Sequence, residues 1–306
     1  MLALNLLALV TAVAATDSTS SSAAASPSSS AAASPSVTDV DILQYALTLE
    51  HLEAAFYKEA LGKFKSSDFA SGGEQYTLFQ QIAGHEQTHV ETLTSVIGAD
   101  KATKACNYSF PYTDVAGFRS LAQVLEGVGT SAYLGAAHYL TNPAFVTAAG
   151  SILTVEARHS AWLATTNGED PWPGAFDTPL GLNQVYSLAA AFITSCPSTN
   201  PALPVKAFPA LSASTASNLK AGQSVTFNLP STVNSTSGQL YAAFLTGGTI
   251  EYAPYTVNQS VTIPTSVNST GTIYAVITSS NSSVTDDNTV AGPAVLQFNG
   301  AFPRGV

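Results

Sequence analysis

Two stretches of this chain, 70 residues apart, carry the same pattern of one carboxylate and one histidine inside an apolar stripe. The two stretches read Ile82-x3-Glu86-x2-His89-x3-Leu93 and Ile152-x3-Glu156-x2-His159-x3-Leu163. Residues three or four apart lie on one face of an α-helix, so each Glu and His should point the same way as the core residues. A carboxylate in a protein core is costly unless it is neutralised or bound to a metal ion. The repeat therefore predicts a helical bundle with charged groups inside it.

A second pattern is repeated in two further helical stretches. Tyr57 follows Glu50 by seven residues, and Tyr133 follows Glu126 by the same interval, which is about two helical turns. Glu53 also lies beside the apolar face and is the rival of Glu50. The position equivalent to Glu53 in the later stretch is glycine, which favours Glu50. The chain thus contains two copies of one helix pair, with Glu on the first helix and Glu-x-x-His on the second.

One Glu from each of two helices, with Glu-x-x-His from each of the other two, is the ligand pattern of bundles that hold two iron or two manganese ions. Four carboxylates offset the charge of two divalent ions, two of them can bridge, and each histidine completes one ion. The predicted metal ligands are Glu50, Glu86, His89, Glu126, Glu156 and His159. A hydrogen-bonded polar core without metal is the alternative.

Tyr57 and Tyr133 are predicted to lie beside the two ions, as hydrogen-bond donors to the ligands or as redox-active catalytic phenols. Ordinary packing in an aromatic core is the alternative for both.

The string His85-Glu86-Gln87-Thr88-His89 also matches the H-E-x-x-H motif of zinc proteases. That motif needs a third ligand further along the chain, and the later stretch offers a second Glu-x-x-His instead. We therefore disfavour the protease interpretation, and His85 is not expected to bind metal.

Helical periodicity extends over residues 39–62, 74–98, 114–140, 143–166 and 182–195. After Pro197 short β-rich runs alternate with Gly, Asn, Ser and Pro, which is typical of an antiparallel sandwich of about seven strands. The predicted fold class is α+β multidomain, with a four-helix bundle plus a fifth helix at 38–197, a linker at 198–212 and a small antiparallel β-sandwich domain at 213–306.

The N-terminal residues indicate export. Residues 1–15 are apolar and end in small residues, as in a signal peptide, although no Lys or Arg precedes Lys58. Residues 16–37 are nearly all Ser, Ala, Thr and Pro, so we expect a disordered, O-glycosylated stalk. A membrane anchor is the alternative for the apolar run, which is shorter than the ~20 residues that a span needs. We therefore expect a secreted protein, associated with the cell wall, and no membrane contact after signal cleavage.

The cysteines and sequons fit the same compartment. The two cysteines, Cys106 and Cys196, are expected to form one disulfide, which would stabilise the fold by roughly 4 kcal/mol in the chain-entropy model. Two free buried thiols are the alternative. Asn-x-Ser/Thr sequons, the acceptors of N-glycosylation, occur at Asn107, Asn234, Asn258, Asn268 and Asn281.

The charge of the chain argues against a nucleic-acid partner. Only 10% of residues are charged and the formal net charge is −10, and no cluster of Lys or Arg is present to bind phosphates.

Four segments, Tyr45 to Tyr57, His85 to His89, Ala122 to Glu126 and Val155 to His159, resemble the ferritin-like domain proteins of fungi, which are related to plant desiccation-related proteins. This group includes secreted proteins named for stress response or late sexual development. The resemblance covers roughly residues 38 to 210 and implies a ferritin-like four-helix bundle with a di-metal centre. It does not imply a reaction.

Two functions are compatible with these features. The first is a secreted di-iron or di-manganese oxidoreductase that handles a small oxidant, peroxide or dioxygen, in stress or development. The second is a non-catalytic glycoprotein of the cell surface, which binds cell-wall components and in which the metal only stabilises the bundle. Bulk iron storage is less plausible, because a β-domain and a stalk on each subunit would obstruct a hollow cage.

Overall fold

The computed structural model describes residues 37–69, 73–231, 233 and 238–299. The predicted signal peptide, all but the last residue of the predicted stalk, and the sequon at Asn234 lie outside the described residues.

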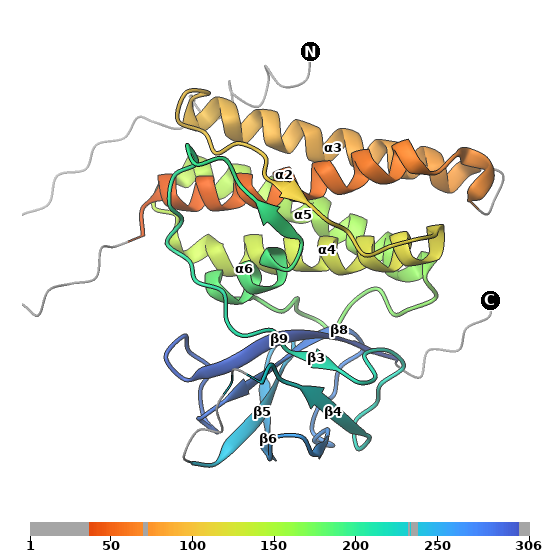
Figure 1. Cartoon of the computed structure of the whole chain (residues 1–306), viewed down its shortest axis with the longest axis vertical. Coiled ribbons are helices and arrows are strands. Elements are labelled where there is room, and N and C mark those ends of the chain that lie inside the picture. Colours follow the sequence, from red (N-terminus) through yellow and green to blue (C-terminus); the bar gives the residue numbers. More distant parts are fainter. Residues whose placement is uncertain (1–36, 70–72, 232, 234–237, 300–306) are drawn as a thin grey trace, which may run out of the picture.

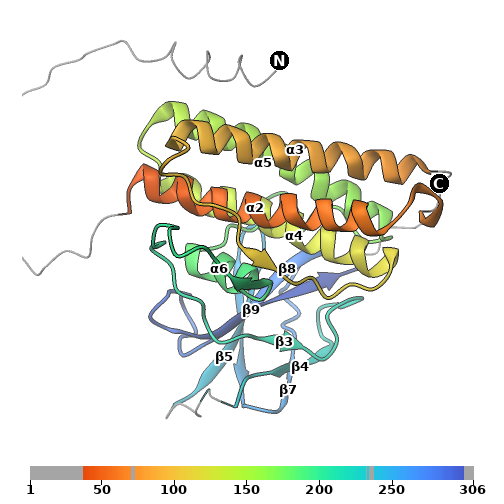
Figure 2. The same cartoon turned by 45° about the horizontal axis from the view of Figure 1, so that its top comes forward.

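The first half of the described chain forms a bundle of long helices that run side by side (Figure 2). They are α2 (Asp39–Lys63), α3 (Glu74–Ile97), α4 (Val115–Ala136) and α5 (Pro143–Thr166). Helix α2 packs along α3, and α4 packs along α5, so each predicted helix pair is a contiguous hairpin in space.

Local sequence fixes where three of these helices begin. Thr38 and Asp41 form a reciprocal capping box at the start of α2. The Asp114 side chain accepts a hydrogen bond from the Gly117 amide at 2.8 Å, and Asn142 caps α5 ahead of a proline in its first turn. Among the described residues, no helix is long and apolar enough to cross a bilayer.

The fifth helix is shorter than the sequence predicts. Helix α6 (Leu182–Ala190) ends five residues early, and β2 (Ile193–Ser195) pairs instead with β1 (Asn107–Tyr108). Ile193 and Ser195 pair with β1, and the Cys106–Cys196 disulfide holds the two segments together. The end of the predicted helix is therefore a strand.

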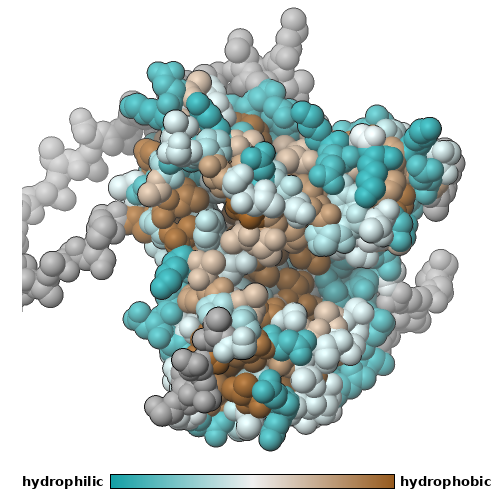
Figure 3. Space-filling view, viewed as in Figure 1, coloured by the Kyte–Doolittle hydropathy of each residue, from teal (hydrophilic) through white to brown (hydrophobic). Residues whose placement is uncertain are grey.

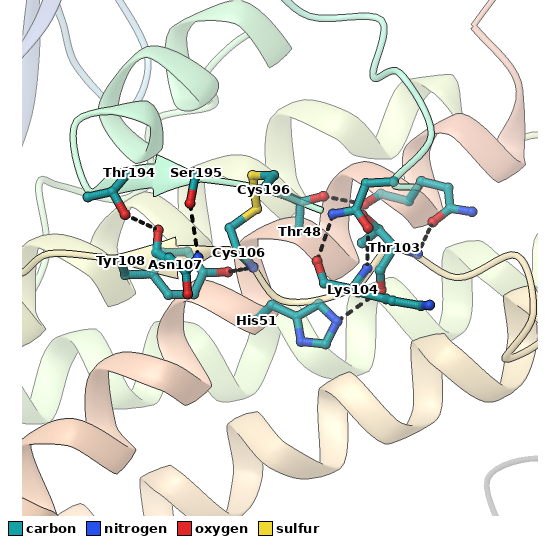
Figure 4. The surroundings of a disulfide bond; sticks show 12 residues. Thr48, His51, Thr103, Lys104, Cys106, Asn107, Tyr108, Thr194, Ser195 and Cys196 are labelled. Atoms are coloured by element: carbon teal, nitrogen blue, oxygen red, sulfur yellow. Dashed lines mark hydrogen bonds between the residues drawn. A yellow bond between two sulfur atoms is a disulfide. The ribbon is translucent and has the colours of Figure 1, made fainter. Parts of the chain in front are cut away.

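A disulfide at one end of this ribbon joins the residue before β1 to the residue after β2 (Figure 4). Cys106 and Cys196 are bonded as predicted and tie the α3–α4 connection to the segment after α6. Beside them the His51 ring is hydrogen-bonded to the Thr103 carbonyl at 3.0 Å. The pair closes a loop of 90 residues, which limits the freedom of the unfolded chain.

The C-terminal part consists of two antiparallel sheets, as predicted. One has the order β3-β4-β7 and the other the order β6-β5-β8-β9. The strands are β3 (Ser212–Ala213), β4 (Ser224–Asn228), β5 (Leu240–Leu245), β6 (Ile250–Tyr255), β7 (Ser260–Thr262), β8 (Gly271–Thr278) and β9 (Thr289–Phe298). Both sheets contribute to one buried cluster that includes Phe227, Phe244, Ile273 and Leu296. Together the two sheets thus form a sandwich.

The bundle rests on the larger sheet, and α6 lies between them (Figure 1). Tyr45 of α2, Val128 of α4 and Val185 of α6 share one buried cluster with Tyr274 and Val276 of β8. Burying apolar surface at this junction fixes the sheets against the two helices that carry Glu50 and Glu126.

Tyr274 also makes the buried polar contacts of the junction. Its hydroxyl donates to the Gly127 carbonyl at 3.0 Å and lies 2.9 Å from the Ser131 hydroxyl. We expect Tyr274→Phe to lower the free energy of unfolding by about 1–2 kcal/mol, because two buried groups lose a partner. Chemical denaturation measures this. Tyr255→Phe, which removes a single bond to the Phe227 carbonyl inside the sandwich, is the control and should cost less.

Candidate metal centre

The structure brings all six predicted ligands together in the middle of the bundle. Glu50 comes from α2, Glu86 and His89 from α3, Glu126 from α4, and Glu156 and His159 from α5. The four carboxylates are fully buried, and the histidines are 9% and 7% exposed. Each helix presents these residues on the face that also carries its core side chains, because they follow the helical period.

The six side chains form two overlapping groups, each able to surround one ion. Glu50, Glu86, His89 and Glu156 make the first group, and Glu86, Glu126, Glu156 and His159 make the second. Within each group the potential ligand atoms lie within 4.8 Å of one another. Glu86 and Glu156 belong to both groups, so they are the carboxylates that two ions would share, and we call them the bridging carboxylates.

Both histidines turn the same ring nitrogen toward this cluster. His89 Nδ1 lies 3.2 Å from Glu50 Oε2, 3.3 Å from Glu86 Oε2 and 3.2 Å from Glu156 Oε1. His159 Nδ1 lies 3.0 Å from Glu126 Oε2 and 3.3 Å from Glu86 Oε1. Nδ1 is thus the nitrogen that each histidine would offer to a metal ion.

Burial and mutual repulsion hold protons on the bridging carboxyls. Burial, followed by the charges of Glu86 and Glu126, raises the pKa of Glu156 well above its ordinary value. Burial and the charge of Glu126 raise the pKa of Glu86 to about 7. For Glu126, burial is outweighed by hydrogen bonds and charge from His159, so its pKa is lowered.

The two histidines behave as cations while no metal is bound. Burial alone would lower their pKa values, but hydrogen bonds and charges from the carboxylates outweigh it. Glu50 and Glu86 raise the pKa of His89 to about 10, and Glu126 and Glu86 raise that of His159 to about 9. The imidazolium charges thus partly replace the charge that metal ions would supply.

The imidazolium charges leave some carboxylate oxygens of the cluster without a partner, and this is the strongest sign that the cluster suits metal ions. Glu86 Oε1 and both oxygens of Glu156 are buried without a hydrogen-bond partner. The contacts of Glu86 Oε1 with His159 and of Glu156 Oε1 with His89, at 3.3 Å and 3.2 Å, lack hydrogen-bond geometry. Buried polar atoms are nearly always satisfied, so orphaned oxygens at the bridging positions fit a group of ligands for cations.

The two predicted tyrosines hydrogen-bond the outer carboxylates, Glu50 and Glu126, each of which belongs to one ligand group only. Tyr57 of α2 donates to Glu126 of α4, and Tyr133 of α4 donates to Glu50 Oε1 of α2 at 2.5 Å. Burial, followed by the neighbouring carboxylates, raises the pKa of both phenols well above the ordinary value. Both tyrosines therefore contact ligand carboxylates, and their hydroxyls are positioned to orient Glu50 and Glu126.

His85 contacts the centre although sequence analysis assigned it no part. Its Nδ1 lies 2.9 Å from Nε2 of His159, and the two rings meet edge to edge with their planes 5° apart. His85 thus contacts Nε2 of His159, whereas Nδ1 of His159 faces the carboxylates. The equivalent position in α5 is Val155, so the two halves of the centre differ here. The H-E-x-x-H string could have indicated a role for His85, since it places this histidine next to the predicted ligand Glu86.

Glu53 is the second departure from the internal symmetry. It is 4% exposed but belongs to neither ligand group, which supports Glu50 as the inward carboxylate of α2. A Cβ at Gly129 would lie 3.1 Å from Glu53 Oε1 and 3.4 Å from Glu156 Oε2. Glycine on α4 therefore leaves room for the Glu53 carboxyl beside a bridging carboxylate. Burial, followed by Glu126, raises the pKa of Glu53 well above its ordinary value.

Comparison with known proteins agrees with this architecture. Residues 38–169 match the family model of the ferritin-like domain. The chain is also 32% identical over 176 residues to Protein rds1 of Schizosaccharomyces pombe. The aligned residues make up 56% of this chain and 44% of that protein. The chain thus spans less than half the length of this relative. The ferritin-like bundle followed by antiparallel sheets, predicted from the sequence, is confirmed.

Proposed function

We propose that this chain holds two divalent ions of iron or manganese and uses them to react with peroxide or dioxygen. Glu50 and His89 would bind one ion, Glu126 and His159 the other, and Glu86 and Glu156 would bridge them. The observation that carries the proposal is the pair of buried carboxylates shared by both ligand groups. When bound, such a pair of ions would supply redox chemistry, giving electrons to one peroxide molecule and regaining them from a second.

The protein's own residues have three tasks in this proposal. The fully buried carboxylates neutralise the ions and keep them away from bulk water. Tyr57 and Tyr133 orient the outer carboxylates, and His85 orients His159. The remaining coordination positions are left to the oxidant, because each ion receives four protein residues.

Glu86→Ala tests the proposal directly. We expect the parent protein to contain about two ions per chain and to consume peroxide, and the variant to lose both properties, because a ligand of both ions is gone. Elemental analysis, EPR and a peroxide electrode provide the measurements. Glu91→Ala is the matched control, since Glu91 is an exposed carboxylate of the same helix. Less than one ion per chain in folded parent protein would refute the proposal.

Replacing Tyr133 by phenylalanine tests whether its hydroxyl only orients Glu50 or also takes part in electron transfer. Tyr133→Phe removes the hydrogen bond to Glu50, so we expect metal affinity to fall about 10- to 100-fold. At saturating Mn²⁺, turnover should return if the phenol only orients its ligand, and it should stay low if the phenol carries an electron. Metal titration and peroxide consumption at saturating Mn²⁺ distinguish the two roles, and Tyr57→Phe provides the symmetric comparison.

A second candidate is a secreted, non-catalytic glycoprotein of the cell wall, in which the metal stabilises the bundle. The sequons favour it, because Asn107, Asn258, Asn268 and Asn281 are all exposed. Export to the cell wall and a role in stress or development are part of both proposals. Bound metal without peroxide or dioxygen turnover would favour this candidate over the first.

A further inference from the structure

A cavity of about 170 Å³ lies at the junction of the bundle, α6 and the sandwich. Leu52 of α2, Val128 of α4, Leu188 of α6 and Pro293 of β9 contribute to its wall. On the face shown in Figure 1, hydrophobic surface gathers over this junction (Figure 3). A cavity of this size can hold a benzene-sized molecule.

One ionisable side chain lines this apolar cavity, the carboxyl of Glu53. It is 4% exposed, and no hydrogen bond or ion pair joins it to another described residue. A carboxyl this deeply buried, with no hydrogen bond from the described residues, costs free energy unless water or a ligand in the cavity bonds to it.

The cavity also adjoins the metal centre. Gly129 lines it, and the Glu53 and Glu156 carboxyls both approach the space above that glycine. Glu53 thus stands between the cavity and a bridging carboxylate. A second cavity, of about 180 Å³, lies between α2, α3, α4 and α5 next to Tyr133, but its one carboxylate, Glu91, is exposed. Of these two cavities among the described residues, the first combines an apolar wall with a buried carboxyl that no side chain hydrogen-bonds.

We propose that the cavity between α2, α4 and α6 binds a small uncharged apolar molecule with one hydroxyl group, an alcohol or a phenol, and that Glu53 hydrogen-bonds this hydroxyl. The apolar wall matches the body of such a molecule. The carboxyl matches its hydroxyl in either form, because a carboxylate accepts and a carboxylic acid also donates. Charged or strongly polar molecules are excluded, because they would lose hydration against this wall.

The proposal concerns binding and does not depend on turnover at the metal centre. A molecule held there would be separated from Glu156 by Glu53 alone. If the proposed metal ions are bound, this molecule would be an organic substrate or ligand close to them. That extension rests on the proposed function.

Phenol and toluene are suitable probes because they have nearly the same shape and differ in one hydroxyl. We expect the full chain to bind phenol about tenfold more tightly than toluene, as one buried hydrogen bond predicts. Glu53→Leu should abolish this preference, whereas Glu53→Gln, which keeps a hydrogen-bonding group, should retain most of it. Leu188→Trp, which fills the cavity, should weaken both probes. Ligand-observed NMR measures the affinities of phenol and of toluene for each protein, both metal-free and loaded with Mn²⁺.

Glu91→Leu is the matched control, since it removes the carboxylate of the other cavity and should change neither affinity. An unchanged preference in folded Glu53→Leu, or loss of phenol binding in Glu91→Leu, would overturn the proposal. Loss of the preference on loading with Mn²⁺ would also overturn it, because Glu53 would then be a metal ligand. If Glu53→Leu does not fold, Leu188→Trp decides: phenol binding that survives a filled cavity refutes the site.

Discussion

Glu156→Gln is expected to abolish binding of both ions and yet to stabilise the metal-free protein. Glu156 is fully buried, both of its oxygens lack hydrogen-bond partners, and its pKa is raised well above the ordinary value by burial and by Glu86. Folding of the metal-free chain must therefore place a proton on a group that is ionised in the unfolded chain at neutral pH. Glutamine has nearly the same shape and carries no charge, so that cost disappears.

We expect the free energy of unfolding in a chelator at pH 8 to rise by about 1–3 kcal/mol, because protonating a buried carboxyl on folding costs about 1.4 kcal/mol for each pH unit above its unfolded pKa. Chemical denaturation measures the stability and elemental analysis measures the metal content. Glu126→Gln is the control, because the pKa of Glu126 is lowered by its bonds to His159. This variant should also lose metal but should destabilise the metal-free protein. Equal signs for the two variants would contradict this account of the charges.

The bundle and its buried cluster of carboxylates and histidines were predictable because core-facing residues recur with the period of the helix. Helical spacing placed Glu86 with His89 and Glu156 with His159 on core-facing stripes, and an internal repeat gave two independent copies of the signal. The repeat also favours Glu50 over Glu53, and Glu50 belongs to one of the two groups able to surround an ion whereas Glu53 belongs to neither. Propensity and punctuation placed the long helices to within a few residues.

The features that break the repeat could not be predicted in the same way. Glu53 faces Gly129 across two helices, and His85 meets His159 across two others, so both contacts depend on how the helix pairs dock. The last residues of the predicted 182–195 helix form a strand because β1 and a disulfide lie beside them in space. Local periodicity does not specify such partners, since tertiary contacts override it.

The sign of the pH dependence should reverse when metal binds. In the metal-free protein the pKa values of His89 and His159 are about 10 and about 9, above their unfolded value of 6.5. Their stabilisation is complete below pH 6.5 and is lost as the pH rises through 9 to 10. Glu86, with a folded pKa of about 7, and Glu156 also hold protons that the unfolded chain releases above pH 4.5. The metal-free protein should therefore lose stability steadily from about pH 5 to pH 9.

Bound ions would displace these protons, because metal ligands must be deprotonated. The loaded protein should gain stability between pH 5 and pH 7, as the unfolded histidines release their protons, and then change little. Each proton of difference changes the free energy of unfolding by about 1.4 kcal/mol per pH unit. Denaturation at pH 6 and pH 8.5, with EDTA or with excess Mn²⁺, measures both slopes. Calorimetry in buffers of different ionisation enthalpy should find about three or four protons released per ion pair at pH 7, from His89, His159, Glu156 and part of Glu86. Parallel slopes with and without Mn²⁺, or no proton release, would show that the buried histidines and carboxylates are not the ligands.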